Sequence, residues 1–178
     1  MSKNKKILSL DAETNGLYGD AFAIGAILMD KETGKEEKRF LARCPINGEV
    51  DSFVKDNVLP QMEAIEETRE CYEWMLEDFI KFYMENKQNA DIVVHMGVPV
   101  EAKLFIDAQK MGIMGTFDGP YPLVDIAAYP EIWDSVDAYN KERGIEVPDC
   151  QGGTHNPLYD CFAAALAYRH VRGANKGE

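Results

Sequence analysis

The sequence predicts an α/β fold in which helices cover the faces of a mixed sheet. Three apolar, strand-like segments follow one another through short connections at the beginning of the chain, and helix-like and strand-like segments then alternate. Strands joined by short turns pair antiparallel, whereas strands reached through a helix run parallel to a neighbour. With 178 residues, 46% of them hydrophobic, the chain fits one domain, residues 1–178, with a core from 5 to about 172.

The first half of the chain predicts three strands and one long helix. The strands are expected at Ile7–Ala12, Ala21–Met29 and Lys35–Cys44, and Lys31–Gly34 is typical of a hairpin turn between the last two. The segment 47–61 is expected to be a loop with a short helix. Apolar residues spaced three and four apart then predict an amphipathic helix from 68 to about 86.

The second half alternates between strands and helices. In chain order, the expected elements are a strand at Asp91–His95, a helix at Val100–Met111, a strand at Pro122–Ile126, a helix at Ser135–Arg143 and a helix from Pro157 to about Arg172. Asn156 before Pro157 is typical of an N-cap followed by proline in the first helical turn. Gly144 is expected to end the fourth of these elements.

The charge and cysteine content restrict the function. Nineteen basic residues stand against 31 acidic ones, a net charge of -12, which argues against a protein that grips long duplex DNA through its phosphates. This balance leaves room for a short substrate and for bound divalent cations. No apolar run approaches the ~20 residues of a membrane span, so no membrane partner is expected. The four cysteines lack CxxC spacing and no export signal is present, which favours reduced thiols in a cytoplasmic protein.

Two carboxylates end the first predicted strand. Asp11 and Glu13 are two residues apart, so both side chains lie on one face of that strand. Neighbouring carboxylates repel each other, and Mg²⁺ or Mn²⁺ bound by their oxygens would relieve that repulsion. A second interpretation, an acidic strand end in contact with solvent, fits this pair equally well.

A histidine and an aspartate introduce the last predicted helix. Asp160 lies near its first turn, where the helix dipole favours a carboxylate, and His155 lies on the loop before it. Ala163, Ala164 and Ala167 form a stripe that would let this helix approach the sheet and bring Asp160 near the strand carboxylates. An ordinary acidic first turn and a surface histidine are the alternatives. Histidine is the side chain best suited to accept a proton at neutral pH.

A further acidic residue opens the helix predicted at Val100–Met111. Glu101 falls in its first turn and would supply another carboxylate to the same end of the sheet. A surface glutamate stabilised by the helix dipole explains the residue equally well.

Together these segments resemble one family. DAETNGL at Asp11–Leu17 and HNPLYD at His155–Asp160 resemble the first and third motifs of the DEDDh 3′–5′ exonucleases, the DnaQ-like group that includes proofreading exonucleases, RNase T and oligoribonuclease. The segment IVVHMGVPVEAKLF is similar to the second motif. The resemblance covers Ile7 to about Tyr168. It implies a DEDDh-type exonuclease domain with an RNase H-like fold, in which five strands have the order 3-2-1-4-5 and strand 2 is antiparallel.

The resemblance also assigns roles to individual residues. It implies two ions of Mg²⁺ or Mn²⁺, held by four carboxylates that also take part in catalysis: Asp11, Glu13, Glu101 and Asp160. His155 would be the general base that activates water. A further set would contact the terminal nucleotide: Thr14, Gly16, Leu17 and His155.

The second motif departs from the family pattern. The family places asparagine after the histidine and an aspartate further on, whereas this chain has Met96 and Glu101, and the spacing from His95 is one residue longer. Asp107 is the alternative ligand, nearly two helical turns further along.

The implied function is hydrolysis of phosphodiester bonds at single-stranded 3′ ends of DNA or RNA, with release of nucleoside 5′-monophosphates. One alternative is an oligoribonuclease-like enzyme that trims RNA ends. Another is a non-catalytic relative that binds nucleic acid ends or a protein, against which the intact acidic and histidine positions argue. A phosphatase with a DxD nucleophile is disfavoured, because residue 13 is glutamate and no P-loop is present. A homodimer and a polymerase partner both stay open.

Overall fold

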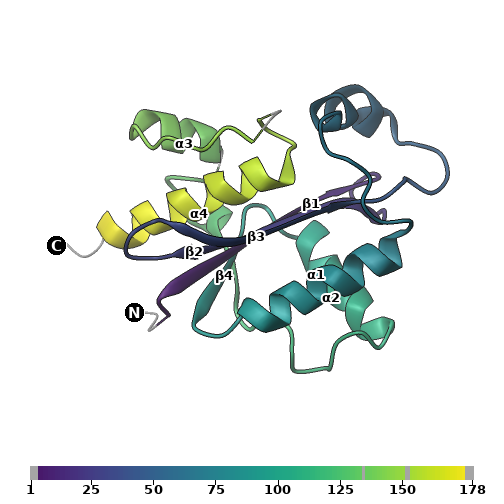
Figure 1. The fold of residues 1–178 in the computed structure, drawn as a ribbon. Coiled ribbons are helices and arrows are strands. Elements are labelled where there is room, and N and C mark those ends of the chain that lie inside the picture. Colours follow the sequence, from purple (N-terminus) through teal and green to yellow (C-terminus); the bar gives the residue numbers. More distant parts are fainter. Residues whose placement is uncertain (1–3, 134, 151–152, 175–178) are drawn as a thin grey trace.

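The computed structural model describes residues 4–133, 135–150 and 153–174. Five strands form one sheet in the order β3-β2-β1-β4-β5 (Figure 1). In chain order they are β1 (Lys6–Thr14), β2 (Ala21–Asp30), β3 (Glu36–Arg43), β4 (Ala90–Val94) and β5 (Leu123–Asp125). β2 runs antiparallel to β1 and β3, and β4 runs parallel to β1 and β5. The predicted α/β class, strand order and strand directions are therefore confirmed.

Helices cover both faces of this sheet. The described residues include four α-helices: α1 (Tyr72–Asn86), α2 (Val100–Lys110), α3 (Val136–Glu142) and α4 (Pro157–Ala174). Short helical turns in the same part of the chain are η1 (Val54–Val58), η2 (Leu59–Met62) and η3 (Ile126–Ala128). α1 and α2 lie on one side of the sheet, and α3 and α4 lie on the other (Figure 1). None of the helices described here combines the length and apolarity that a membrane crossing needs.

The alternation of side chains along β1 separates a packing face from a face that bears the acidic residues. Leu8, Leu10 and Ala12 belong to the core beneath α1 and α2, whereas Ile7 belongs to the core beneath α4. Because alternate residues share a face, the side chains of 9, 11 and 13 lie on the same face as Ile7. The acidic end of β1 is thus directed toward α4.

The first long helix begins later than the sequence predicts. The periodic pattern suggested a start at Thr68, but α1 starts at Tyr72. The backbone N–H groups of Thr68 and Arg69 both donate to the carbonyl of Arg43 at the end of β3, at 2.9 and 3.0 Å. These donors serve to attach the connection to the sheet, so the helix starts only afterwards. The predicted strand at 91–95 is also shifted, because β4 ends at Val94 and leaves His95 beyond it.

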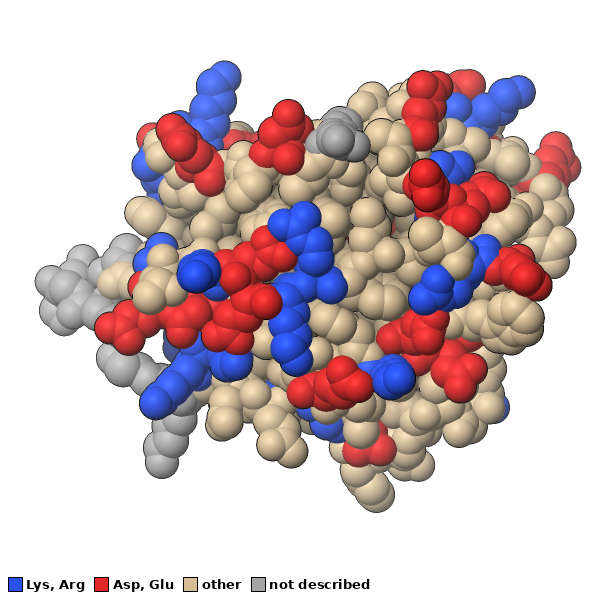
Figure 2. All heavy atoms as spheres, viewed as in Figure 1, with Lys and Arg blue, Asp and Glu red and all other residues tan. Residues whose placement is uncertain are grey.

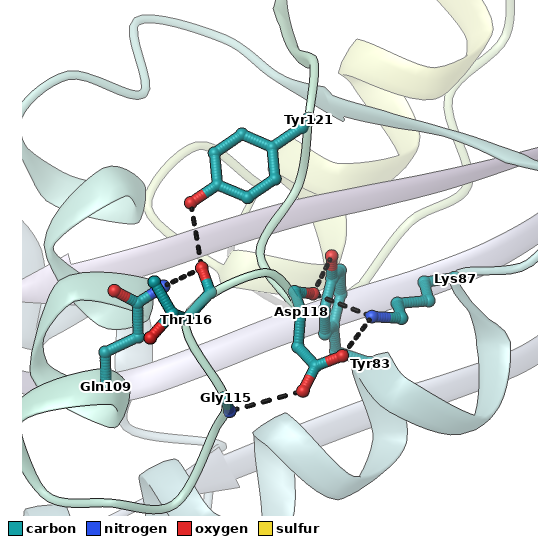
Figure 3. Close-up of polar contacts among 7 residues, drawn as sticks. All are labelled: Tyr83, Lys87, Gln109, Gly115, Thr116, Asp118 and Tyr121. Atoms are coloured by element: carbon teal, nitrogen blue, oxygen red, sulfur yellow. Dashed lines mark hydrogen bonds and ion pairs between the residues drawn. The ribbon is translucent and has the colours of Figure 1, made fainter.

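The loop between α2 and β5 is fixed to α1 by hydrogen bonds (Figure 3). The Asp118 carbonyl accepts from the Tyr83 hydroxyl at 3.0 Å and from Lys87 Nζ at 2.8 Å, and its side chain accepts from Gly115 N at 3.2 Å. This loop leads into β5, so it lies at the amino-terminal end of the parallel strands. The acidic end of β1 lies at the opposite, carboxyl-terminal end.

Candidate active site

The acidic end of β1 meets the beginning of α4. Asp11, Glu13 and Asp160 each offer a carboxylate oxygen, and these oxygens lie within 4.8 Å of one another. Asp11 and Glu13 come from the last residues of β1, and Asp160 comes from the first turn of α4. The structure therefore brings together the acidic residues of the first and third sequence motifs.

Small residues allow this close approach. Gly25 of β2 lies opposite Asp11 in the sheet register, and a Cβ atom added to it would lie 2.7 Å from the carbonyl carbon of Pro157. The sheet thus touches the backbone of the first turn of α4 at Gly25. The expected stripe of small residues is also buried on this helix: Ala163, Ala164 and Ala167. The contribution of Gly25 was not anticipated, although a glycine inside an apolar strand is a recognised sign of close backbone approach.

Asp11 lies at the centre of this acidic cluster. Its Oδ2 atom is buried and has no hydrogen-bond partner among the described residues. Burial raises the pKa of Asp11 well above its usual range, and the charges of Asp160, Glu101 and Glu13 raise it further. A buried carboxylate oxygen without a donor is costly, and a bound cation would remove that cost.

The other two carboxylates are partly compensated by the loop before α4. Asp160 Oδ2 accepts a hydrogen bond from the backbone N–H of His155 at 2.9 Å. Burial, followed by the charge of Glu13, still raises the pKa of Asp160 to about 7. Burial also raises the pKa of Glu13, while the neighbouring imidazole of His155 acts in the opposite direction. The cluster therefore favours protons or cations at neutral pH.

His155 lies directly beside this cluster. Its Nδ1 atom is 3.4 Å from Glu13 Oε1, and this interaction raises the pKa of His155 against the effect of partial burial. The edge of its ring faces Phe53, with ring centroids 6.3 Å apart. A hydrogen bond from Nδ1 to a carboxylate leaves Nε2 to accept a proton. The structure therefore places His155 beside the acidic cluster, next to Glu13.

Glu101 occupies the point where two parallel strands separate. The β1–β4 pairing extends to Ser9 and Val93, and beyond it the Ala12 N–H donates to Glu101 Oε1 at 2.9 Å. The residue is 3% exposed, and burial raises the pKa of Glu101 to about 8. Glu101 is thus a buried residue of the site region and not a surface glutamate. It lies next to the group formed by Asp11, Glu13 and Asp160 and is not part of it.

Asp107, the alternative ligand, binds side chains outside the acidic cluster. Its Oδ2 atom accepts from the Tyr72 hydroxyl at 2.9 Å and from Lys103 Nζ at 2.5 Å. An ammonium group already balances this carboxylate. The structure does not bring Asp107 to the acidic cluster.

A hollow of about 360 Å³ adjoins the cluster on the side of Glu13. Its lining includes the residues expected to contact a nucleotide, Thr14, Gly16 and Leu17, together with Phe53 of the segment before η1. Leu17 and Phe53 are both more than half exposed, at 57% and 59%. Phe53 could not be predicted as part of the site, because no local motif connects residue 53 with the acidic cluster.

The loop that bears Gly16 is attached to the segment that bears Phe53. Asn15 Oδ1 accepts from the Asp51 N–H at 2.8 Å, and Asn15 Nδ2 donates to the Glu49 carbonyl at 2.9 Å. Gly16 has a φ of 77°, a backbone conformation that glycine adopts without strain. These bonds connect two segments that both line the hollow.

The donor set fits Mg²⁺ or Mn²⁺. Both ions prefer carboxylate oxygens, which Asp11, Glu13 and Asp160 supply, and Asp11 Oδ2 has no protein donor of its own. In the part of the chain that the structure describes, no lysine or arginine forms an ion pair with these three carboxylates.

The strand order β3-β2-β1-β4-β5, with β2 antiparallel to its neighbours, is the order that the resemblance to the DEDDh exonucleases implied. Among solved structures with this fold, the nuclease domain of 3′hExo, a DEDDh family member bound to rAMP, is similar over 99% of this chain and 94% of its own, with a TM-score of 0.67 and 14% identity. Exonuclease X in complex with 5′ overhanging duplex DNA is similar over 97% and 94%, with a TM-score of 0.63 and 19% identity. The Mg²⁺- and Mn²⁺-bound form of S. pombe Pop2p is similar over 96% and 84%, with a TM-score of 0.61 and 12% identity.

These likenesses establish the fold that the motifs implied. No protein-family model matches the sequence, and no curated protein matches it.

Proposed function

We propose that this protein is a metal-dependent 3′–5′ exonuclease that releases nucleoside 5′-monophosphates from single-stranded ends. The observation that carries the proposal is the meeting of Asp11, Glu13 and Asp160 around a buried oxygen without a donor, with His155 at 3.4 Å from Glu13. A phosphodiester is anionic, so an acidic pocket of this kind suits it only when cations are bound there. The 3′–5′ direction is taken from the resemblance to the DEDDh motifs.

The carboxylates would hold the metal ions. Asp11, Glu13 and Asp160 are the proposed ligands, and Glu101 is proposed to contribute from the neighbouring gap between the strands. Held by these carboxylates, divalent ions would supply a lower pKa for the attacking water and compensation for the negative charge that develops on the phosphate and the leaving oxygen. The protein's own task is to keep these oxygens in place, and it leaves Asp11 Oδ2 without a donor that would compete with a cation.

His155 is the proposed general base. The Glu13 carboxylate, with Oε1 3.4 Å from Nδ1, favours a proton on Nδ1 and so leaves Nε2 to take the proton of the attacking water. Gly16 and Leu17 are proposed to contact the terminal nucleotide, with Thr14 beside them in the same hollow. A volume of about 360 Å³ is at the lower end of the ~300–1,000 Å³ typical of small-molecule sites, which suits one terminal nucleotide.

The structural neighbours support this proposal through what they bind. 3′hExo holds rAMP, Exonuclease X holds DNA, and S. pombe Pop2p holds Mg²⁺ and Mn²⁺. An RNA-specific trimming enzyme would catalyse the same hydrolysis on a chain that contains ribose. The experiment therefore compares DNA with RNA.

The surface charge favours a short binding site. On the face seen in Figure 2, lysine and arginine side chains are interspersed with acidic ones and do not form a continuous basic track. With 19 basic against 31 acidic residues in the whole chain, side chains can neutralise few phosphates. We therefore expect contacts to two or three phosphates near the end, with the logarithm of the binding constant falling by about 0.7 per phosphate for each tenfold rise in salt concentration.

The test is incubation of the protein with 5′-labelled single-stranded DNA and RNA of one sequence, in Mg²⁺ or Mn²⁺. We expect products that shorten one nucleotide at a time and mononucleotides with a 5′-phosphate. A circular oligonucleotide of the same sequence should stay intact, and a chelator should stop the reaction. Tight binding of the ends without cleavage would favour the non-catalytic alternative. The absence of both binding and cleavage would overturn the proposal.

A further inference from the structure

The loop that presents His155 is held in an unfavourable conformation. His155 has a φ of 70°, in the left-handed region that residues other than glycine seldom adopt. Such a conformation persists only where surrounding contacts impose it. Its own N–H donates to Asp160 Oδ2 at 2.9 Å, and the Asn156 N–H donates to the Gly153 carbonyl at 2.9 Å.

Asp137 in the first turn of α3 supplies further contacts to this segment. One of its carboxylate oxygens, Oδ2, accepts from the Thr154 hydroxyl at 3.1 Å. The other, Oδ1, accepts from the Tyr159 hydroxyl at 2.9 Å. Thr154 directly precedes His155, and Tyr159 directly precedes Asp160. One carboxylate therefore holds the chain on both sides of the proposed base.

The helix that bears Asp137 is itself firmly attached to α4. Ser135 Oγ accepts from the Ala138 N–H at 3.1 Å and caps α3. Asn140 Nδ2 donates to the Ala163 carbonyl of α4 at 3.0 Å, and this side chain is buried. Since α3 is attached to the same helix that bears Asp160, the position of Asp137 relative to the loop is fixed.

We propose that Asp137 is a positioning residue that holds His155 in its catalytic orientation through Thr154 and Tyr159. This inference rests on the proposed function, because it assigns Asp137 a role in the step that His155 performs. Asp137 accepts hydrogen bonds from the hydroxyl groups of Thr154 and Tyr159, and it affects the reaction by holding these two residues in place. A general base displaced by ~1 Å loses on the order of 10²-fold in rate, which sets the scale of the expected effect.

The first test compares Asp137→Ala with Asp137→Asn. Alanine removes both acceptors, and kcat should fall ~10–10²-fold with KM changed by less than about threefold. Asparagine keeps an acceptor for one hydroxyl and offers a donor to the other, so it should restore most of the rate. Glu142→Ala is the matched control, since Glu142 lies on the same helix and pairs with its neighbour Arg143 at 3.3 Å. Equal losses in Asp137→Asn and Asp137→Ala would overturn the proposal.

A double-mutant cycle tests the route of action. If Asp137 acts through His155, adding Asp137→Ala to His155→Ala should change kcat by less than about twofold. Multiplied effects would show that Asp137 acts independently of His155 and would overturn the assignment. Titration with Mn²⁺ should give the same affinity in Asp137→Ala as in the parent, because the carboxylate ligands stay in place. A large loss of Mn²⁺ affinity would make Asp137 a support of the metal site instead.

A final measurement does not depend on activity. Hydrogen exchange of the His155 backbone amide should become at least ~10-fold faster in Asp137→Ala and stay unchanged in Glu142→Ala. If no oligonucleotide is cleaved, the proposed function fails while this measurement still decides whether Asp137 holds the loop. Unchanged exchange in Asp137→Ala would show that it does not.

Discussion

Asp11 and Asp91 are aspartates of neighbouring strands in one sheet, and their surroundings are opposite. Asp91 is the second residue of β4, and it is 7% exposed. Its carboxylate accepts from the Tyr168 hydroxyl at 2.9 Å and from Asn4 Nδ2 at 3.0 Å, and it pairs with the ammonium group of Lys31. The protein itself therefore supplies one cationic group and two hydrogen-bond donors that compensate the charge of the Asp91 carboxylate.

The other end of the sheet has the same residue type without such partners. Asp11 has a buried oxygen that no described donor reaches, and its charged neighbours are three more carboxylates. The comparison separates a carboxylate that the chain itself neutralises, Asp91, from one that it leaves without a donor, Asp11, and the second is the proposed metal ligand. Each prediction below challenges this contrast.

The largest expected effect is on catalysis. Asp160→Asn removes one ligand charge, and we expect kcat in Mg²⁺ to fall ~10³-fold or more, since metal ions supply several kcal/mol of transition-state stabilisation. The metal-free protein should unfold at the same temperature or a higher one, because carboxylate repulsion is relieved. Steady-state kinetics and thermal unfolding in chelator measure the two quantities. Wild-type activity in this variant would remove Asp160 from the site.

The reverse pattern is expected at the other end of the sheet. Asp91→Asn leaves the Lys31 ammonium without its carboxylate, and we expect a loss of ~3 kcal/mol, or roughly 6–12 °C in Tm. Activity per folded molecule should stay unchanged at 25 °C. Glu37→Gln, which breaks the more exposed pair with Lys6, is the matched control and should change stability by less than ~1 kcal/mol.

Glu101→Gln sharpens the comparison within the site. Glutamine can still accept from the Ala12 N–H but has no charge for a metal ion, so kcat should fall ~10–10²-fold and more Mg²⁺ should be required. Asp107→Asn is the matched carboxylate on the same helix, and its activity should stay within ~2-fold of the parent. The opposite outcome would assign the second-motif position to Asp107.

The smallest expected effect is on stability as a function of pH. The pKa values of Asp160 and Glu101 are raised to about 7 and about 8, far above those of the unfolded chain. The stability that these protonated groups contribute is complete below about pH 4 and is lost as the pH rises through 7 to 8. Thermal unfolding in chelator should therefore occur ~5 °C lower at pH 8.5 than at pH 5.5. Asp160→Asn should flatten this dependence, and an unchanged slope would contradict it.

Most elements could be predicted because their signals are local. Asn156, for example, accepts from the Leu158 N–H at 3.0 Å, as an N-cap residue before Pro157 should. The start of α1 could not be placed, because the acceptor that holds Thr68 is a carbonyl of a distant strand. The strand order came from the motif resemblance and not from periodicity.

The site could be predicted as a set of residues but not as a geometry. Spacing placed Asp11 and Glu13 on one face and Asp160 in a first turn, and the structure joins them. No spacing rule connects Asp137 with Tyr159, because they meet only when α3 packs on α4. Whether Glu101 is a surface or a buried residue likewise depends on where β1 and β4 separate.

Because Gly25 contacts the backbone of Pro157, the size of residue 25 determines how closely α4, which bears Asp160, can approach β1, which bears Asp11 and Glu13. A single methyl group there would move α4 outward while leaving every ionisable group of the site in the chain. Under the proposed function, Gly25→Ala would keep every proposed ligand but in a stretched geometry. Such a variant should bind a nucleic acid end and a divalent cation without cleaving the end, which would allow the complex to be studied with its native carboxylates.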